Sequence, residues 1–434
     1  MKKLIISLFS VAACMLNAAT VDIRTTEFRN YKVGETVTFT VTAKADDGSL
    51  MKDGVFTVYV RDSGIDTAEI CKPIEIDLSK ANPAKFTAKL DRPGFIFASP
   101  SSYKTADGKY NRWKSSALKP CDGGAAVEPE KIRQGGTMPS DFDEFWQKSL
   151  AEYKNAKITV KEDPEIKRPG CKVSRVRVEF PDGSGFIDGF LSIPEGAGKF
   201  PAIVSVPGAG HGTTSPYVLV RSSQKCIELH MNVHPYPTMK TSPEMSKLYK
   251  DMNSKLTTKA YQHEFAWDRD KYVYRKVWSA LSRAIDYVAQ LPQFDGKHFA
   301  ASGNSQGGGT ALAMGYLNKN ITCVAASVPA LCDHGGYLAK RQSGWPRLHK
   351  SLKGRADKTA PYFDGANFTA KIKVPTIITV GYIDRTCSPS SVYAAYNNLK
   401  SPVKQIFPMY LNGHRSSPQG FRALTKFLNW HFSQ

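Results

Sequence analysis

Acidic residues are scarce in this chain of 434 residues: 39 Asp and Glu stand against 59 Lys and Arg, which leaves a formal net charge of +20. Such a balance favours contact with polyanions, but it specifies neither a fold nor a reaction. No nucleic-acid-binding module accompanies the charge, so we expect no nucleic acid among the partners. A solvated basic surface is the simpler explanation, and attraction to the uronic acids of a polysaccharide is the alternative.

Cysteines are also few. There are eight, and removal of a signal segment containing Cys14 would leave an odd, scattered set of seven. Such a set is not the disulfide framework of a large domain, and only Cys71 and Cys121 are considered for pairing. No spacing of cysteine and histidine is typical of a metal site, so we expect no metal ion.

Long apolar runs are absent except at the N-terminus, where two lysines precede an apolar stretch at 4–16 and two alanines follow at 18–19. A membrane span needs about 20 apolar residues, so we expect no transmembrane segment. The pattern is typical of an export signal, and residues 1–19 are predicted to be a signal peptide of a periplasmic or extracellular protein. Lipid anchoring through Cys14 is the alternative. We favour simple export because the residues after Cys14 are still apolar.

Residues 20–123 carry the patterns of β-strands. Residues 36–42 and 86–90 alternate polar and apolar side chains, and residues 55–60 are rich in aromatic and β-branched types. These patterns predict half-buried strands. We therefore predict a small all-β domain, an immunoglobulin-like sandwich, at 20–123.

A stretch rich in glycine and charge, 124–137, is predicted to be a linker, and residues 138–434 a second domain. In the first domain Tyr103, Tyr110 and Trp113 are candidates for a sugar-binding platform. Packing in a core or an interface is the better-supported role, because aromatic side chains dominate such contacts.

The pentapeptide GNSQG at 303–307 stands where a predicted strand, 298–302, meets a predicted helix. This is the context of a G-x-S-x-G nucleophile elbow. Its glycines allow a strained turn that projects the serine hydroxyl at a helix N-terminus. So short a motif also occurs by chance or as a helix cap. Ser305 is the candidate nucleophile.

Candidate partners for Ser305 follow in the order that α/β-hydrolases use, Ser, then Asp, then His. A buried-strand pattern at 374–380 ends just before Asp384, and a second strand-like run is followed by His414. The other histidine after Asp384, His431, falls in an amphipathic helical pattern typical of core packing. Asp384 and His414 are therefore the predicted acid and base.

This combination of residue types serves acyl transfer. A serine hydroxyl is a weak nucleophile, so an imidazole must take its proton and return it to the leaving group while a carboxylate orients the ring. The oxyanion needs two donors. We predict the backbone N–H of Gln306 and, from the loop after a strand at 201–206, that of Ala209, with Gly208 and Gly210 as alternatives. The chemistry implies no cofactor.

The second domain resembles the acetyl xylan esterase and cephalosporin C deacetylase family, carbohydrate esterase family 7, whose fold is the α/β-hydrolase fold. The matching motifs are PSDFDEFW at 139–146, YVYR at 272–275, GNSQGG at 303–308, VPALCD at 328–333, VGYIDRTCSPS at 380–390 and AAYN at 394–397. The family's nucleophile, acid and base fall on Ser305, Asp384 and His414. The resemblance implies removal of acetyl groups from acetylated xylan, and it favours a homo-oligomer.

Three segments depart from the family pattern. PGA at 207–209 replaces the usual His-Gly-Tyr, and VHPYP at 233–237 replaces the usual Arg-Gly-Gln segment. Arg415 occupies the position after the base, where the family usually has Glu. We expect the reaction class to survive these changes, and the substrate preference and assembly to be affected. Residues 216–270 form a polar, Lys-rich excursion, and if it covers the site it would set which acetylated sugar fits; its role is left open by the sequence.

The sequence therefore predicts an exported serine esterase of two domains that deacetylates xylan or xylo-oligosaccharides through an acetyl-enzyme. One alternative is a peptidase or a broader acyl esterase on the same fold. Another is a non-catalytic glycan-binding protein whose first domain does the binding. The complete order Ser, Asp, His argues against the last.

Overall fold

The computed structural model describes residues 19–64, 67–115, 121–166, 168–212, 226–238 and 242–434. The predicted signal peptide, with Cys14, lies outside the described residues except for Ala19. Among the helices of the described segments, none combines the length and the apolar character needed to cross a membrane.

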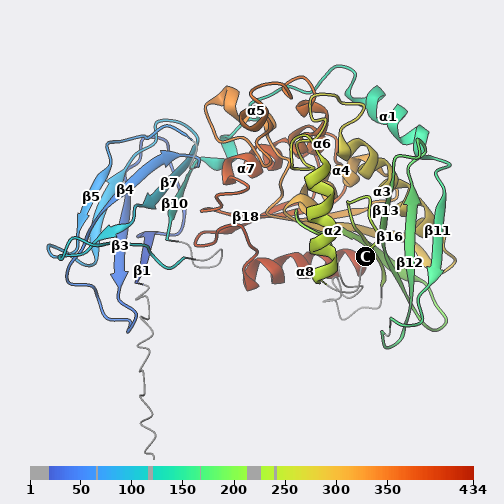
Figure 1. Ribbon diagram of the computed structural model, residues 1–434, viewed down its shortest axis with the longest axis horizontal. Coiled ribbons are helices and arrows are strands. Elements are labelled where there is room, and N and C mark those ends of the chain that lie inside the picture. Colours follow the sequence, from blue (N-terminus) through green and yellow to red (C-terminus); the bar gives the residue numbers. More distant parts are fainter. Residues whose placement is uncertain (1–18, 65–66, 116–120, 167, 213–225, 239–241) are drawn as a thin grey trace, which may run out of the picture.

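The first ten strands form an all-β region, at the left of Figure 1. They are β1 (Thr20–Thr25), β2 (Asn30–Tyr31), β3 (Val37–Lys44), β4 (Val55–Asp62), β5 (Ile74–Asp77), β6 (Ala84–Ala88), β7 (Gly94–Pro100), β8 (Tyr103–Lys104), β9 (Tyr110–Asn111) and β10 (Gly123–Val127).

These strands make two sheets, one in the order β1-β3-β6 and one in the order β2-β10-β7-β4-β8-β9, with β5 beside β4. In β3 every second side chain is buried, as its alternating sequence predicts. Val37, Phe39 and Val41 of the smaller sheet share an apolar cluster with Val58 and Val60 of the larger one. The two sheets therefore enclose a common core.

Strand β10 continues into the stretch that composition predicts to be a linker. Its register pairs Val127 with Gly94 of β7. A side chain at Gly123 would place Cβ 2.6 Å from Ile23, and one at Gly124 would place it 2.6 Å from the carbonyl oxygen of Tyr382. These glycines are needed for close approach to both neighbours, which explains a composition that resembles a linker.

The remaining elements form the second region. They are η1 (Pro129–Lys131), α1 (Phe142–Tyr153), β11 (Ile158–Glu162), β12 (Cys171–Glu179), β13 (Phe186–Pro194), β14 (Phe200–Val206), β15 (Ile227–Met231), α2 (Ser242–Lys255), α3 (Val273–Ala289), β16 (Phe294–Asn304), α4 (Gln306–Leu317), β17 (Cys323–Ser327), η2 (His334–Ala339), α5 (Leu348–Leu352), η3 (Ala360–Phe363), α6 (Gly365–Thr369), β18 (Thr376–Gly381), α7 (Pro389–Asn398), β19 (Lys404–Met409) and α8 (Pro418–Phe432).

Nine strands of this region form one twisted sheet in the order β11-β12-β13-β15-β14-β16-β17-β18-β19, and the six from β15 to β19 in this order run parallel. Helix α8 packs on one face, where Ile203 and Ile377 contact Leu424. Helices α1, α3 and α4 pack on the other face (Figure 1). Both faces are thus buried, which is why every residue of β15, β17 and β18 is buried.

The cysteines carry no disulfide among the described residues. Cys71 and Cys121, the pair considered from the sequence, are both free thiols. Cys121 is buried in the core that the two N-terminal sheets share, where it acts as a small apolar side chain. The disulfide hypothesis for this pair is therefore wrong.

Candidate active site

Ser305 occupies a strained turn between β16 and α4. Its φ of 57° and ψ of −118° lie in a region that residues with a side chain rarely adopt. The turn is held by the N–H of Ser305, which donates to the carbonyl of Ser327 at 2.9 Å, and by the N–H of Ala330, which donates to the carbonyl of Ser305 at 2.9 Å. Strain that is held in this way is typical of functional positions.

The glycines on either side of Ser305 are needed because the backbone is crowded. A Cβ at Gly303 would lie 2.3 Å from the carbonyl carbon of Gly307, and one at Gly307 would lie 2.0 Å from the carbonyl oxygen of Val206. The strand, the helix and the neighbouring β14 therefore meet at distances that only glycine allows. The elbow geometry predicted from the pentapeptide is present.

The three residues predicted as nucleophile, acid and base are joined by hydrogen bonds. The Nδ1 of His414 lies 2.7 Å from Oδ2 of Asp384, and its Nε2 lies 2.8 Å from Oγ of Ser305. Because an ionised carboxylate can only accept, Nδ1–H is the donor and Nε2 is left to accept from the serine hydroxyl. This tautomer is the one that removes a proton from serine.

Asp384 is fixed by its own backbone environment. Its Oδ1 accepts hydrogen bonds from the N–H groups of Thr386 and Cys387 at 2.7 and 2.9 Å, which leaves Oδ2 for His414. The carboxylate is buried, with 1% of the residue exposed. A buried carboxylate with both oxygens engaged holds the imidazole ring in one orientation.

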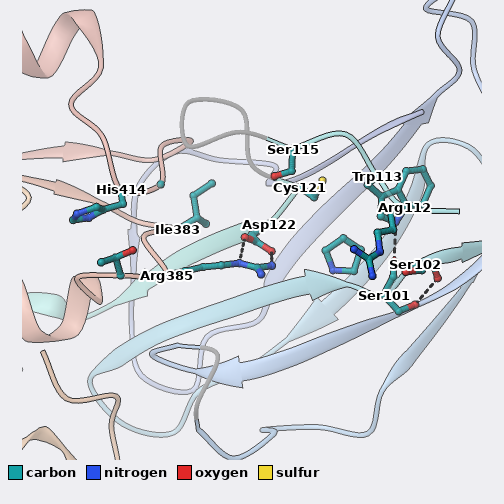
Figure 2. Close-up of a pocket in the computed structure, with 13 residues that line it drawn as sticks. Ser101, Ser102, Arg112, Trp113, Ser115, Cys121, Asp122, Ile383, Arg385 and His414 are labelled. Carbon is teal, nitrogen blue, oxygen red and sulfur yellow. Dashed lines mark hydrogen bonds and ion pairs between the residues drawn. The ribbon is translucent and has the colours of Figure 1, made fainter. Parts of the chain in front are cut away.

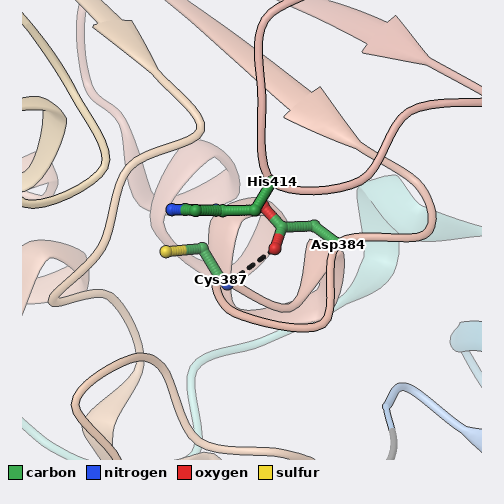
Figure 3. A group of neighbouring side chains, drawn as sticks. All are labelled: Asp384, Cys387 and His414. Carbon is green, nitrogen blue, oxygen red and sulfur yellow. Dashed lines mark hydrogen bonds and ion pairs between the residues drawn. The ribbon is translucent and has the colours of Figure 1, made fainter. Parts of the chain in front are cut away.

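Cys387 lies beside Asp384 and His414, and the three side chains form a small cluster (Figure 3). Its Sγ and the ligand-type atoms of Asp384 and His414 lie within 4.8 Å of one another, and this is the one such three-residue group found in the described segments. Burial raises the pKa of the Cys387 thiol well above its ordinary value. A metal ion would have to deprotonate that thiol and break hydrogen bonds of Asp384 and His414, so the donor set suits a triad better than a metal site.

The three triad residues come from the same edge of the parallel sheet. Ser305 follows β16, Asp384 follows β18, and His414 follows β19. The carboxyl ends of neighbouring parallel strands meet at one edge of such a sheet, where ligands bind. Residues separated by more than 100 positions are thereby brought within hydrogen-bonding distance.

The residues predicted to form the oxyanion hole also lie beside the nucleophile. Gln306 is the first residue of α4, so its N–H is at the positive end of the helix. The loop after β14 approaches from the other side, and a Cβ at Gly208 would lie 3.7 Å from Cβ of Ser305. Ala209, the next residue, is exposed, whereas Gln306 is buried.

The supports of this loop and of Gln306 cannot be identified from the sequence. The side-chain Oε1 of Gln306 accepts a hydrogen bond from Tyr274 at 2.7 Å and another from Tyr261. The hydroxyl of Tyr236 donates to the carbonyl of His211 at 2.6 Å, and Nε2 of His234 contacts the carbonyl of Gly210. Tyr261, from the excursion at 216–270, therefore supports Gln306 on one side of the predicted oxyanion hole. The departing segment at 233–237 supports the loop after β14 on the other side.

The N-terminal sheets also contact the triad loop. Arg385, the residue after Asp384, donates through Nε to Oδ2 of Asp122 at 2.7 Å, and its second nitrogen pairs with Oδ1. Tyr382 donates to the side chain of Asn30 at 2.9 Å and packs edge-on against Phe95. The loop that carries Asp384 is thus held partly by the all-β region.

The two charged side chains of this ion pair, Asp122 and Arg385, differ in their exposure to solvent. The side chain of Asp122 is 3% exposed and that of Arg385 is 50% exposed. Burial raises the pKa of Asp122, and the hydrogen bond to Asp122 raises the pKa of Arg385. Asp122 therefore depends on Arg385 for its charge compensation much more than Arg385 depends on Asp122.

The sequence model of the family described as acetyl xylan esterase (AXE1) matches residues 128–431. The acetyl esterase Axe7A of Xylanibacter ruminicola is 31% identical over 332 residues, which cover 73% of this chain and 70% of that protein.

Two solved structures share the fold of the second region. The acetyl xylan esterase from Paenibacillus sp. R4 has a TM-score of 0.58 and 23% identity and covers 70% of this chain and 98% of its own. Acetyl xylan esterase 1 from Thermoanaerobacterium sp. JW/SL YS485 has a TM-score of 0.58 and 21% identity and covers 70% of this chain and 97% of its own. The predicted α/β-hydrolase fold is thereby confirmed.

Proposed function

This chain belongs to the acetyl xylan esterase family and is a carboxylic ester hydrolase, and from this premise we propose that Ser305, His414 and Asp384 catalyse deacetylation through an acetyl-enzyme. The observation that carries the proposal is the chain of hydrogen bonds from Asp384 through His414 to Ser305. The strained turn at Ser305 supports it, because it directs the hydroxyl to the base.

The proposed reaction has two halves. In the first, Oγ of Ser305 attacks the acetyl carbonyl while Nε2 of His414 takes the hydroxyl proton. The N–H groups of Gln306 and of the 208–209 segment, with Ala209 preferred, stabilise the oxyanion. The C–O bond to the sugar then breaks, and the sugar oxygen leaves with the proton from His414.

In the second half, water attacks the acetyl-serine and His414 accepts its proton. The tetrahedral intermediate collapses, Oγ of Ser305 recovers the proton, and acetate leaves. Asp384 stays ionised throughout and stabilises the imidazolium that forms twice per cycle. His414 carries every proton that moves between Ser305, the sugar oxygen and water, so the proposed cycle uses no cofactor.

We propose acetylated xylan or its oligosaccharides as the substrate, on the strength of the family match. We also propose that the protein is exported, on the pattern of residues 1–19. N-terminal sequencing of protein recovered from outside the cytoplasm should begin at or near residue 20. Recovery with lipid on Cys14 would replace simple export by anchoring.

Acetate release from acetylated xylo-oligosaccharides tests the proposed reaction. Ser305→Ala should abolish release, because removal of a serine nucleophile costs several orders of magnitude in kcat. Ser302→Ala is a matched control that removes a hydroxyl three positions earlier, where it donates to the carbonyl of Ala325. Equal activity of the wild type and Ser305→Ala, with both folded, would contradict the assignment.

The acyl group tests the alternative of a broader esterase or a peptidase. A series of p-nitrophenyl esters from acetate to octanoate should be cleaved with kcat/KM highest for acetate and falling with chain length. Intact-protein mass spectrometry after rapid quench should show one added acetyl group, which Ser305→Ala should lack. Preference for long acyl chains or for peptides would contradict deacetylation.

A further inference from the structure

A cavity of about 550 Å³ lies between the all-β region and the triad loops, and His414 lines one end of it. Loops after β18 and β19 supply Arg385 and Gly413, and the N-terminal region supplies the opposite wall. The volume falls within the roughly 300–1,000 Å³ that is usual for small-molecule sites. Figure 2 shows the labelled side chains from both regions around this space.

The opposite wall carries an aromatic ring that is fixed in place. Trp113 is partly buried, and its ring centroid lies 4.2 Å from that of Tyr103 and, edge-on, 5.0 Å from that of Phe56. Its Nε1–H donates a hydrogen bond to the carbonyl of Ser101 at 2.8 Å. A rigid indole that loses little freedom on binding is a suitable surface for the apolar face of a sugar ring. The core-packing role and the platform role weighed for Trp113 are therefore compatible.

The same wall carries a cation without a counter-charge. Arg112 is exposed and lines the cavity, and no hydrogen bond or ion pair from it to another described side chain is found. Arg385 is already paired with Asp122. The described residues that line the cavity thus carry two guanidinium groups and one carboxylate, a formal net charge of +1 that is complementary to an anion. Guanidinium groups bind carboxylates with two parallel hydrogen bonds.

We propose that this cavity is a glycan subsite of the esterase, in which Trp113 packs on a sugar ring and Arg112 binds the carboxylate of a uronic acid branch. The proposal rests on the proposed deacetylation, because the glycan enters the site only as the part of the substrate that flanks the reacting acetyl group at His414. The all-β region is then part of the substrate site, and it directs the enzyme toward acidic, branched xylan.

The test compares three substrates: p-nitrophenyl acetate, neutral acetylated xylo-oligosaccharides, and the same oligosaccharides with a glucuronic acid branch. For Trp113→Ala the ratio of kcat/KM on either oligosaccharide to kcat/KM on p-nitrophenyl acetate should fall about tenfold, because KM for the oligosaccharides rises. For Arg112→Gln the fall, again about tenfold, should be confined to the acidic oligosaccharide and should shrink as salt rises.

Matched controls lie on the same region but outside the cavity. Tyr110→Ala removes an aromatic ring that is 73% exposed, and Lys114→Gln removes an exposed cation. Neither residue lines the cavity, so both variants should keep the wild-type ratios. Trp113→Phe preserves an aromatic platform and should recover most of the loss seen with Trp113→Ala.

The outcomes separate the two proposals. Wild-type protein that cleaves none of the three substrates would refute the proposed reaction. Wild-type activity with unchanged substrate ratios in Trp113→Ala and Arg112→Gln would overturn the subsite. An equal loss on all three substrates would also overturn it, because that result indicates a structural role.

Discussion

The ion pair between Arg385 and Asp122 should respond very differently to removal of each partner. Arg385→Met leaves a carboxylate that is 3% exposed without its counter-charge. Stranding a buried charge costs about 3–5 kcal/mol. Asp122→Asn leaves a guanidinium that is 50% exposed and that water can solvate, so we expect a cost of about 1 kcal/mol.

The cost of Arg385→Met should also depend on pH. Burial already raises the pKa of Asp122, and loss of Arg385 removes the two effects that lower it. A carboxyl group whose pKa is higher in the folded than in the unfolded chain destabilises the fold only above the unfolded pKa of about 3.9. The deficit of Arg385→Met should therefore be largest near pH 7 and shrink as the pH falls toward 4.

Urea unfolding of the wild type, both single variants and the double variant at pH 7 and pH 5 measures this directly. The double variant should recover most of the Arg385→Met loss, because no buried charge is left without a partner. Equal costs for the two single variants would refute the reasoning. So would a deficit of Arg385→Met that is the same at both pH values.

Three further predictions concern the site and its surroundings. Ser305→Gly should be as inactive as Ser305→Ala but more stable by about 1 kcal/mol in urea unfolding, because glycine relieves the strain at a φ of 57°; equal stability would contradict the strain. Asp384→Asn should lower kcat on p-nitrophenyl acetate by about 10⁴-fold, since an amide favours the wrong tautomer of His414, and a loss below tenfold would contradict its role. Burial lowers the pKa of His230 from 6.5 to about 4, so at this position the unfolded chain binds a proton first as the pH falls. The contribution of His230 to the unfolding free energy should drop by about 1 kcal/mol between pH 7 and 5.5, and the total drop measured by urea unfolding should be smaller by that amount in His230→Gln.

The chain's own sequence was enough to place the triad, because each member sits in a local pattern. Ser305 lies in a short motif between strand and helix signals, and Asp384 and His414 follow apolar runs that are long enough to be buried strands. Parallel strands bring such positions to one edge of a sheet whatever their distance in sequence. The local patterns and the order of the residues were therefore sufficient.

The same sequence could not identify the contacts that support the triad. Gln306 is held by Tyr261 and Tyr274. Tyr274 lies in the family-like motif at 272–275, but nothing in that motif points to Gln306, and Tyr261 lies in no recognisable motif. The glycines of β10 have the composition of a linker, although Gly123 is required by the close approach of Ile23 and Gly124 by that of Tyr382. Close packing leaves no periodic signal in the sequence.

What the sequence determined by itself is the reaction class, a carboxylic ester hydrolase, and a predicted triad of serine, aspartate and histidine whose members the structure joins by hydrogen bonds. What only the tertiary structure decided is which residues of the all-β region contact the loops that carry Asp384 and His414. Asp122 and Arg385 are 263 positions apart, and Trp113 and His414 line one cavity from distant parts of the sequence. Such contacts arise when two independently patterned segments dock, and the docking is specified by complementary shape and charge that no single segment of the sequence carries.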